Sequence, residues 1–341
     1  MPSPFPNRPP EERGAVHRLD VESTALVGNA LGDPSRRDLF VYTPPNYDPE
    51  GAPLPAIVVL PGYTGMGEKL LARGFTDVSL AARADDLIAG GVPPFLLVMP
   101  DCMTRLGGSQ YVDSPGLGRY ATHIVDEVRR VVADRFCASG RWGVTGHSSG
   151  GFGALHLAMT HPGAFQAAAS HAGDLGFDIT FMADLSKLVS AVHRHGGLEA
   201  FVDGFWSRRN HSGTDIAALM MLCVCCAYLP DPDRHPLPCR IPVDLETGAV
   251  DFDAYQDLCR MDPIARLDDP HQADALRALD LLFIDAGIRD EYNLHLGARR
   301  FSQALTDRGI SHIHEEFDGG HRGMAWRYAV SLTHIAEVLS E

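Results

Sequence analysis

The fold of this chain is decided by residues 142–152, which read WGVTGHSSGGF. Residues 142–145 have the character of a buried strand, and a helical stretch follows at 152–161. Between them, Gly146-His147-Ser148-Ser149-Gly150 has the pattern Gly-x-Ser-x-Gly. In that context the serine occupies a sharp strand-to-helix turn, which exposes its hydroxyl above a helix N-terminus. We therefore predict that Ser148 is a nucleophile; an ordinary turn is the alternative.

Short apolar runs recur along the chain, and each is followed by a helical stretch. These runs are 56–60, 95–99, 142–145, 165–170 and 281–285. The alternation indicates a mainly parallel sheet with helices on both faces. Residues 16–27 and 37–44 alternate like strands and predict an antiparallel start to the sheet, and 312–317 predicts a final strand. Helical spacing of apolar residues predicts helices at 121–136, 292–308 and 324–339. We expect an α/β protein with the α/β-hydrolase fold.

One long segment, residues 174–269, interrupts this rhythm. It holds helical stretches at 184–194 and 214–228 and a proline-rich loop at 230–242, without a clear sheet strand. We predict that it is an inserted, largely helical cap. The core would then comprise residues 15–173 and 270–341, and the proline-rich residues 1–14 would form an N-terminal arm.

Composition narrows the possible partners. A formal net charge of −15 without a basic patch argues against nucleic acid. No apolar run reaches the roughly 18 residues that span a bilayer, and the start does not read as a signal peptide. The seven cysteines are odd in number and match no zinc pattern, which favours buried free thiols and a reducing cytoplasm. We expect a small-molecule ester substrate and neither metal nor cofactor.

The apolar run 217–229 is either cap core or the contact of a homo-oligomer.

A catalytic serine needs a base and an acid that orients the base. In this fold the chain order is serine, then acid, then the histidine base. The predicted strand 281–285 leads into a loop that contains Asp290. We choose Asp290 over Asp285, which is still in the strand, and over Glu291, which we place in the first turn of the next helix. The alternative to this triad role is that Asp290 only caps the N-terminus of the next helix.

The base follows the last predicted strand. Two glycines at 319–320 precede His321 and allow a sharp loop that brings the imidazole toward Ser148. His312 and His314 alternate within the strand and are expected to be structural, and His147 is expected to point away from the reaction. We therefore predict the triad Ser148, Asp290 and His321.

Acyl transfer also requires donors for the oxyanion. The backbone N–H of Ser149, directly after the nucleophile, is one. The loop after strand 56–60 offers the other, because Gly62 and Gly65 let its backbone turn the amides inward. We choose Tyr63 first and Thr64 second. A plain strand-to-helix turn is the alternative for this loop.

Several of these motifs resemble the esterase D family, which includes feruloyl and acetylxylan esterases, enterobactin esterases and mycolyltransferases. The matching segments are 60–65, 108–111, 146–155, 287–290 and Gly320-His321 followed by Trp326. The resemblance implies the fold, the triad and acyl-ester chemistry. Two positions depart from it: Pro61-Gly62 stands where the family often has His-Gly, and Ser149 where methionine is usual. Neither change removes a backbone donor.

We expect a serine hydrolase that cleaves carboxylic esters through an acyl-enzyme. Thr64, His171 and Trp326 are the candidates for substrate binding, with an ordinary packed histidine as the alternative for His171. Transfer of the acyl group to a sugar or another alcohol is a rival reaction, as is peptide or thioester cleavage by the same triad. The rival from another class is a non-catalytic binding protein on a hydrolase scaffold.

Overall fold

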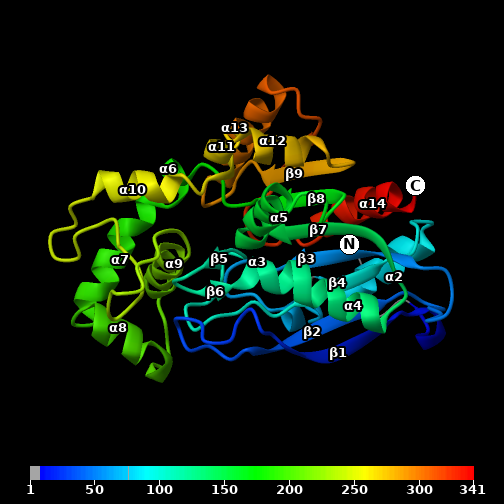
Figure 1. Ribbon diagram of the computed structural model, residues 1–341, viewed down its shortest axis with the longest axis horizontal. Helices are drawn as coiled ribbons and strands as arrows, with labels where there is room; N and C mark the ends of the chain where they lie inside the picture. The colour runs from blue at the N-terminus through cyan, green and yellow to red at the C-terminus, as the bar shows by residue number, and fades with distance from the viewer. Residues whose placement is uncertain (1–7, 76) are drawn as a thin grey trace.

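A central sheet of eight strands organises the computed structural model, which describes residues 8–75 and 77–341 (Figure 1). The strand order is β1-β2-β4-β3-β7-β8-β9-β10. The strands are β1 Ala15–Glu22, β2 Arg36–Thr43, β3 Leu54–Leu60, β4 Leu96–Pro100, β7 Ala138–His147, β8 Ala167–His171, β9 Leu281–Gly287 and β10 Ile313–Phe317. β1, β2 and β4 pair antiparallel, and all pairs from β4 to β10 are parallel. The predicted α/β class is confirmed.

The first strand ends earlier than predicted. Its pairing with β2 stops at Glu22, whereas the sequence suggested a strand to residue 27. The reason is a buried carboxylate: the hydroxyl of Ser23 and the backbone N–H of Ala25 both donate to Glu127, at 2.5 and 3.0 Å. The bond from Ala25 satisfies a backbone donor that the sheet ladder would otherwise satisfy, so the chain leaves the sheet there.

Helices cover both faces of the sheet, as strand alternation requires. On β3, Ala56, Val58 and Leu60 face one hydrophobic cluster, while Ile57 and Val59 face the other. Three helical elements cover the first cluster: the helical run from residue 120 to 135, α5 Ser149–Thr160 and α13 Leu294–Asp307. Two helices cover the second cluster, α2 Leu80–Ala89 and α14 Arg327–Ser340. The helical run consists of α3 Tyr120–Thr122, a π-helical stretch His123–Val128 and α4 Arg129–Arg135.

The segment between β8 and β9 is helical. Its helices are α6 Phe177–Thr180, α7 Met182–Arg194, α8 Leu198–Gly204, a 3₁₀ turn Phe205–Ser207, α9 Gly213–Tyr228, α10 Phe252–Cys259, α11 Pro263–Arg266 and α12 Pro270–Arg277. Figure 1 shows α7 to α10 gathered beside the sheet, whereas α11 and α12 lie close to it. Residues 218–229, which span most of α9 and the residue after it, are buried except for the half-buried Met220, so this run is core rather than a subunit contact.

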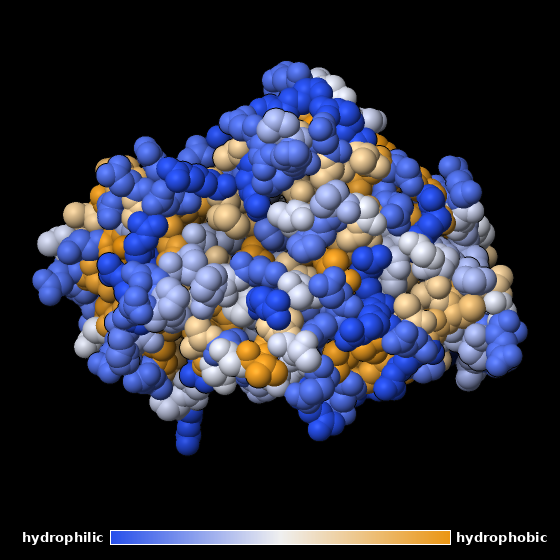
Figure 2. Space-filling view, viewed as in Figure 1, coloured by the Kyte–Doolittle hydropathy of each residue, from blue (hydrophilic) through white to orange (hydrophobic). Residues whose placement is uncertain are grey.

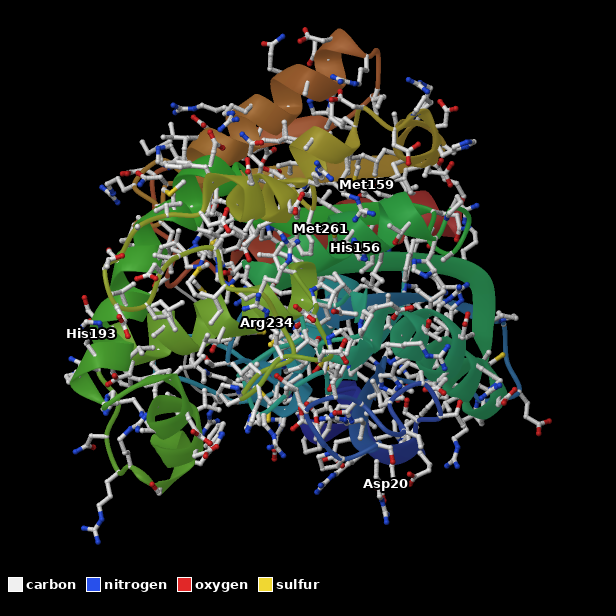
Figure 3. All side chains as sticks on the ribbon, turned by 60° about the vertical axis from the view of Figure 1, so that its left-hand side comes forward. Asp20, His156, Met159, His193, Arg234 and Met261 are labelled. Atoms are coloured by element: carbon white, nitrogen blue, oxygen red, sulfur yellow. The ribbon has the colours of Figure 1, made fainter. Side chains whose placement is uncertain are left out.

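A buried contact ties the end of this segment to the core. Arg266 on α11 donates to Nδ1 of His156 on α5 at 2.7 Å, and Figure 3 shows His156 on α5 among the packed helices. Burial, together with the charge of Arg266, lowers the pKa of His156 well below its ordinary value, so the ring is a neutral acceptor. The division into arm, core and cap stays a prediction.

The remaining described elements are short. They are a 3₁₀ turn Pro10–Glu12, α1 Gly67–Leu70 and the hairpin β5 Asp113–Ser114 with β6 Gly118–Arg119. Residues 1–7 of the predicted arm lie outside the described residues. Polar side chains cover most of the face in Figure 2, with apolar patches between them. Among the described helices, none is long and apolar enough to cross a membrane.

Candidate active site

The turn from β7 into α5 has the geometry of a nucleophile elbow. Ser148 adopts φ 58° and ψ −124°, which is strained for a residue with a side chain. Its flanking glycines have no room for a Cβ: at Gly150 it would lie 2.0 Å from the carbonyl oxygen of Leu60, and at Gly146 2.2 Å from that of Gly150. Close backbone packing therefore dictates the Gly-x-Ser-x-Gly pattern.

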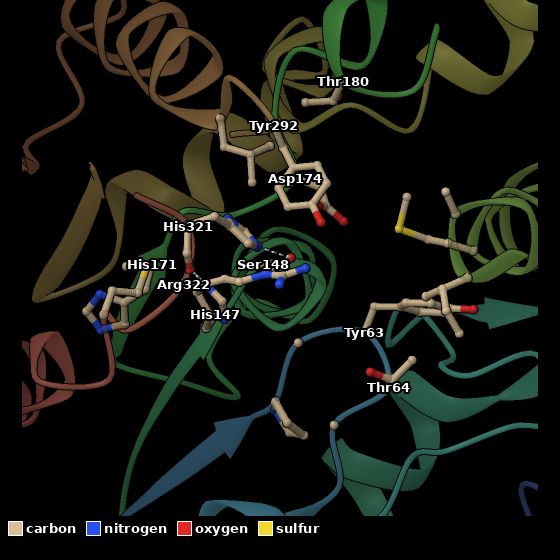
Figure 4. Close-up of a pocket in the computed structure, with 18 of the residues that line it drawn as sticks. Tyr63, Thr64, His147, Ser148, His171, Asp174, Thr180, Tyr292, His321 and Arg322 are labelled. Atoms are coloured by element: carbon tan, nitrogen blue, oxygen red, sulfur yellow. Dashed lines mark hydrogen bonds between the residues drawn. The ribbon is translucent and has the colours of Figure 1, made fainter. Parts of the chain in front are cut away.

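The three residues of the predicted triad lie together (Figure 4). The Ser148 hydroxyl lies 3.1 Å from Nε2 of His321, and Nδ1 of His321 lies 2.8 Å from Oδ2 of Asp290. The other oxygen of Asp290 accepts the backbone N–H groups of Tyr292 and Leu294, at 2.8 and 3.3 Å. Burial opposes ionisation, but the hydrogen bonds and the charge of His321 hold the pKa of Asp290 below its ordinary value. The carboxylate can therefore orient the imidazole and stabilise its positive charge.

Two neighbours of the triad differ from expectation. Glu291 precedes the next helix, which begins only at Leu294, and its carboxylate accepts the backbone N–H of His321 at 2.6 Å. His147 does not point away: its ring packs 4.5 Å from that of His321, and its Nε2 donates to the His321 carbonyl at 3.1 Å. Burial lowers the pKa of His147 to about 3, so it stays neutral. Both residues fix the loop that carries His321.

The loop after β3 lies directly against the nucleophile. A Cβ on Gly62 would come within 3.2 Å of the Ser148 Cβ. The N–H of Thr64 donates to the Gly107 carbonyl at 2.8 Å, whereas no described residue accepts the N–H of Tyr63 or of Ser149. The choice of Tyr63 over Thr64 thus has a physical reason, because the Thr64 donor is already used. The oxyanion role itself stays a prediction.

A second loop holds this donor in place. The phenol of Tyr63 donates to the Leu106 carbonyl at 2.7 Å, and its ring fills the space where a Cβ of Gly107 would lie. The phenol of Tyr111 donates to the Pro61 carbonyl at 2.5 Å. The sequence indicated this loop only through its family resemblance.

A cavity of about 1070 Å³ opens over Ser148, between the core loops and helices α7 and α9. Its lining includes Thr64 and His171, two of the three residues predicted to bind substrate. His171 is buried, and its ring nitrogens are bonded to Asp285 and Ser331 at 2.8 and 2.7 Å. Its carbonyl accepts the N–H of Ser148 at 2.9 Å, so the backbone of His171 holds the backbone of Ser148.

Trp326 lies outside the lining of this cavity, contrary to our expectation. Its indole is 46% exposed and packs edge-on against Phe317, with the guanidinium of Arg327 5.0 Å from its ring. Because Arg327 turns inward to the buried Asp285, the neighbouring tryptophan is directed away from the cavity.

One residue that lines the cavity was not among the site residues predicted from the sequence. Asp174 lies three residues past the end of β8 and is 7% exposed. Burial raises the pKa of its carboxyl to about 7. The rule that selected Asp290, an acid just beyond a strand, could have found it. Within the described residues, no group of three or more His, Cys, Asp or Glu side chains is placed to hold a metal ion.

Comparison with known proteins places the chain in a family. The model of the family described as "Putative esterase" matches residues 29–213, more than half of the chain. The chain belongs to this esterase family. Membership confirms the prediction of a carboxylic ester hydrolase. A search of curated proteins gives no match.

Solved structures share the fold of this esterase. A ferulic acid esterase is 16% identical, with a TM-score of 0.60 over 96% of this chain and 99% of that one. The fluorophosphonate-binding serine hydrolase FphF of Staphylococcus aureus is 16% identical, with a TM-score of 0.57 over 96% and 100%. An S-formylglutathione hydrolase from Agrobacterium tumefaciens is 16% identical, with a TM-score of 0.57 over 96% of both chains. The α/β-hydrolase fold and the resemblance to the esterase D family are confirmed.

Proposed function

We propose that this esterase cleaves small carboxylic esters through an acyl-enzyme on Ser148. The observation that carries the proposal is the continuous relay from the Ser148 hydroxyl through His321 to Asp290, at 3.1 and 2.8 Å, at the floor of an open cavity. Nucleophile, base and orienting acid at hydrogen-bond distance are what covalent acyl transfer requires.

In the proposed mechanism, Nε2 of His321 takes the proton of Ser148 as Oγ attacks the acyl carbon. The negative charge that develops on the carbonyl oxygen is held by the N–H groups of Tyr63 and Ser149. His321 then gives its proton to the oxygen of the leaving alcohol, and the C–O bond breaks. A water deprotonated by His321 attacks the acyl-enzyme, and Ser148 recovers its proton as the acid leaves.

The cavity volume and the net charge support a small-molecule substrate, and the free cysteines support a cellular location. A cavity of about 1070 Å³ suits a small molecule, and a net charge of −15 disfavours nucleic acid. Among the described residues the seven cysteines are all free, which supports action in a reducing cytoplasm. Whether the chain forms a homo-oligomer is a separate question, which light scattering of the purified protein answers.

The test is hydrolysis of p-nitrophenyl esters from acetate to palmitate by the wild type and by Ser148→Ala. The loss of Ser148 is expected to lower turnover by a factor on the order of 10⁶, to the background rate. Ser186→Ala is the matched control, since Ser186 is an exposed serine of α7. The proposal is wrong if Ser148→Ala keeps more than a few per cent of the wild-type rate.

A fluorophosphonate probe separates the remaining alternatives. Labelling of Ser148, read by mass spectrometry of the modified peptide, is expected in the wild type and not in Ser148→Ala. An unreactive Ser148 would favour a binding protein on this scaffold. Acyl transfer is measured in the same ester assay by adding an alcohol and recording how the acyl group divides between water and the alcohol.

A further inference from the structure

The carboxyl group of Asp174 faces the active-site cavity, and the residue is only 7% exposed. Asp174 lines the cavity together with Ser148 and His321, yet no described residue donates a hydrogen bond to its carboxyl or forms an ion pair with it. A buried carboxyl without a partner opposes folding, and buried polar groups are normally satisfied. A group left in this state inside a substrate cavity is one that a substrate can satisfy.

The backbone before Asp174 has an unusual conformation that places the residue at the cavity. Ala172 has φ 43°, a left-handed conformation that is unfavourable for alanine, and its N–H donates to the Asp285 carbonyl at 2.7 Å. Gly173 is enclosed: a Cβ would lie 2.3 Å from Oγ of Ser170 and 2.9 Å from the backbone of Gly151. The turn between β8 and Asp174 is therefore closely packed, and the chain maintains it in spite of the strain at Ala172.

The position of Asp174 identifies the part of the substrate that it faces. In Figure 4 it lies beside Tyr292 and above Ser148, whereas Tyr63 lies below and to the right of Ser148. Tyr292 packs edge-on against the His321 ring at 4.8 Å, and the charge of His321 acts on Asp174. Because His321 returns its proton to the leaving alcohol, the groups near His321 surround that alcohol.

The charges of the cavity indicate which kind of donor fits. The chain has only two lysines, Lys69 and Lys187, and both line this cavity together with Arg322. Besides Asp174, two acids line the cavity, and both are paired: Asp184 with Lys187 and Asp77 with Arg83, each at 2.6 Å. For Lys69 and Arg322 the described residues include no acidic partner. These positive charges disfavour a cationic alcohol and favour an uncharged hydroxyl as the donor.

We propose that Asp174 is a specificity-determining residue that accepts a hydrogen bond from a hydroxyl group on the leaving alcohol. The preferred substrates are then esters of alcohols that carry a second hydroxyl next to the ester oxygen. This inference rests on the proposed function, because it assumes acyl transfer at Ser148.

The test uses three butyrate esters with the same acyl group: ethyl, 2-hydroxyethyl and 2-(dimethylamino)ethyl butyrate. The kcat/KM for acid release is divided by the rate of hydroxide-catalysed hydrolysis, which removes intrinsic differences in reactivity. At pH 8, above the pKa of about 7 at which Asp174 ionises, the wild type is expected to prefer the hydroxyethyl over the ethyl ester by about 10- to 100-fold, the effect of a hydrogen bond to a charged group. Asp174→Leu is expected to bring that ratio close to one.

Asp178→Asn is the matched control, since Asp178 is an exposed aspartate of α6 outside the cavity lining. It is expected to keep the wild-type ratio. If the leucine variant does not fold, Asp174→Asn takes its place and is expected to lower the ratio at least threefold, because a neutral amide accepts a weaker hydrogen bond.

Two results would overturn the inference. One is a ratio that the folded Asp174 variant leaves unchanged, and the other is a wild type that prefers the dimethylaminoethyl ester. Ethyl butyrate hydrolysis that is lost in Ser148→Ala shows that the proposed function holds whichever ratio is found. Failure of this inference is therefore distinguishable from failure of the catalytic assignment.

Discussion

Replacing Asp174 by asparagine should make the protein more stable at neutral and alkaline pH. Burial raises the pKa of this carboxyl to about 7 in the folded chain, from 3.8 for an unperturbed aspartate. The folded chain therefore binds the proton more tightly than the unfolded chain does between these two values. Stability must fall as the pH rises through this window, and the loss is complete above about pH 7.

The magnitude follows from the same two values. A difference between 3.8 and about 7 corresponds to about 4 kcal/mol when each tenfold change in the equilibrium is worth about 1.4 kcal/mol. Water in the open cavity solvates part of the charge, so we expect ionisation of Asp174 to lower the free energy of unfolding by about 2 kcal/mol. Asparagine has nearly the same shape and cannot ionise, and the variant should gain this free energy of unfolding at pH 8.5 and not at pH 4.

Guanidinium unfolding of the wild type and Asp174→Asn at pH 4, 6, 7 and 8.5 measures the difference. Asp178→Asn controls for removal of an exposed aspartate and is expected to change stability by less than about 1 kcal/mol. A variant that is less stable than the wild type at pH 8.5, or a difference that does not vary with pH, would refute the reasoning. It would mean that the Asp174 carboxylate is satisfied within the folded protein.

Three other variants test the catalytic geometry and the fold. Asp290→Asn should lower kcat for p-nitrophenyl butyrate about 10⁴-fold, because an amide favours the wrong tautomer of His321; a loss below tenfold would show that another carboxylate orients the base. Gly62→Ala should lower kcat about 10- to 100-fold with the protein still folded, because its methyl group would meet Ser148 at 3.2 Å; an unchanged kcat would exclude this loop from the oxyanion site. Burial opposes ionisation of Glu127, but hydrogen bonds from two hydroxyls, an imidazole and a backbone N–H lower its pKa to about 2. Glu127→Gln should therefore cost about 2 kcal/mol at pH 7, and urea unfolding should show this gap closing as the pH falls from about 4.5 to about 2. A gap that persists at pH 2 would point to lost packing instead.

The nucleophile could be read from the sequence because its requirements are local. Gly146 and Gly150 leave no room for a side chain, and these contacts lie within one turn and one adjacent strand end. The acid and base could be found from chain order, because parallel strands bring their carboxyl ends to one edge of the sheet. Asp290 and His321 both follow such ends.

Orientation set by distant contacts could not be read in the same way. Trp326 turns outward because its neighbour Arg327 is held by Asp285, more than 40 residues away in the sequence. Asp174 is notable because none of the residues that the structure describes is its partner, and the sequence does not show which donors surround a carboxyl. The early end of β1 depends on Glu127, whose contacts with Ser23 and Ala25 join two distant segments.

The placement of the two lysines also determines how this protein can be handled. Lys69 is exposed, the side chain of Lys187 is 46% exposed, and both line the cavity above Ser148. Succinimidyl esters and aldehydes react with primary amines, so fluorescent labelling or immobilisation through lysine would attach the dye or the support at the entrance of the active site. The many arginines of the surface would stay unmodified. Conjugation should therefore be directed to an introduced surface cysteine or to a tag, where the attachment leaves the cavity open.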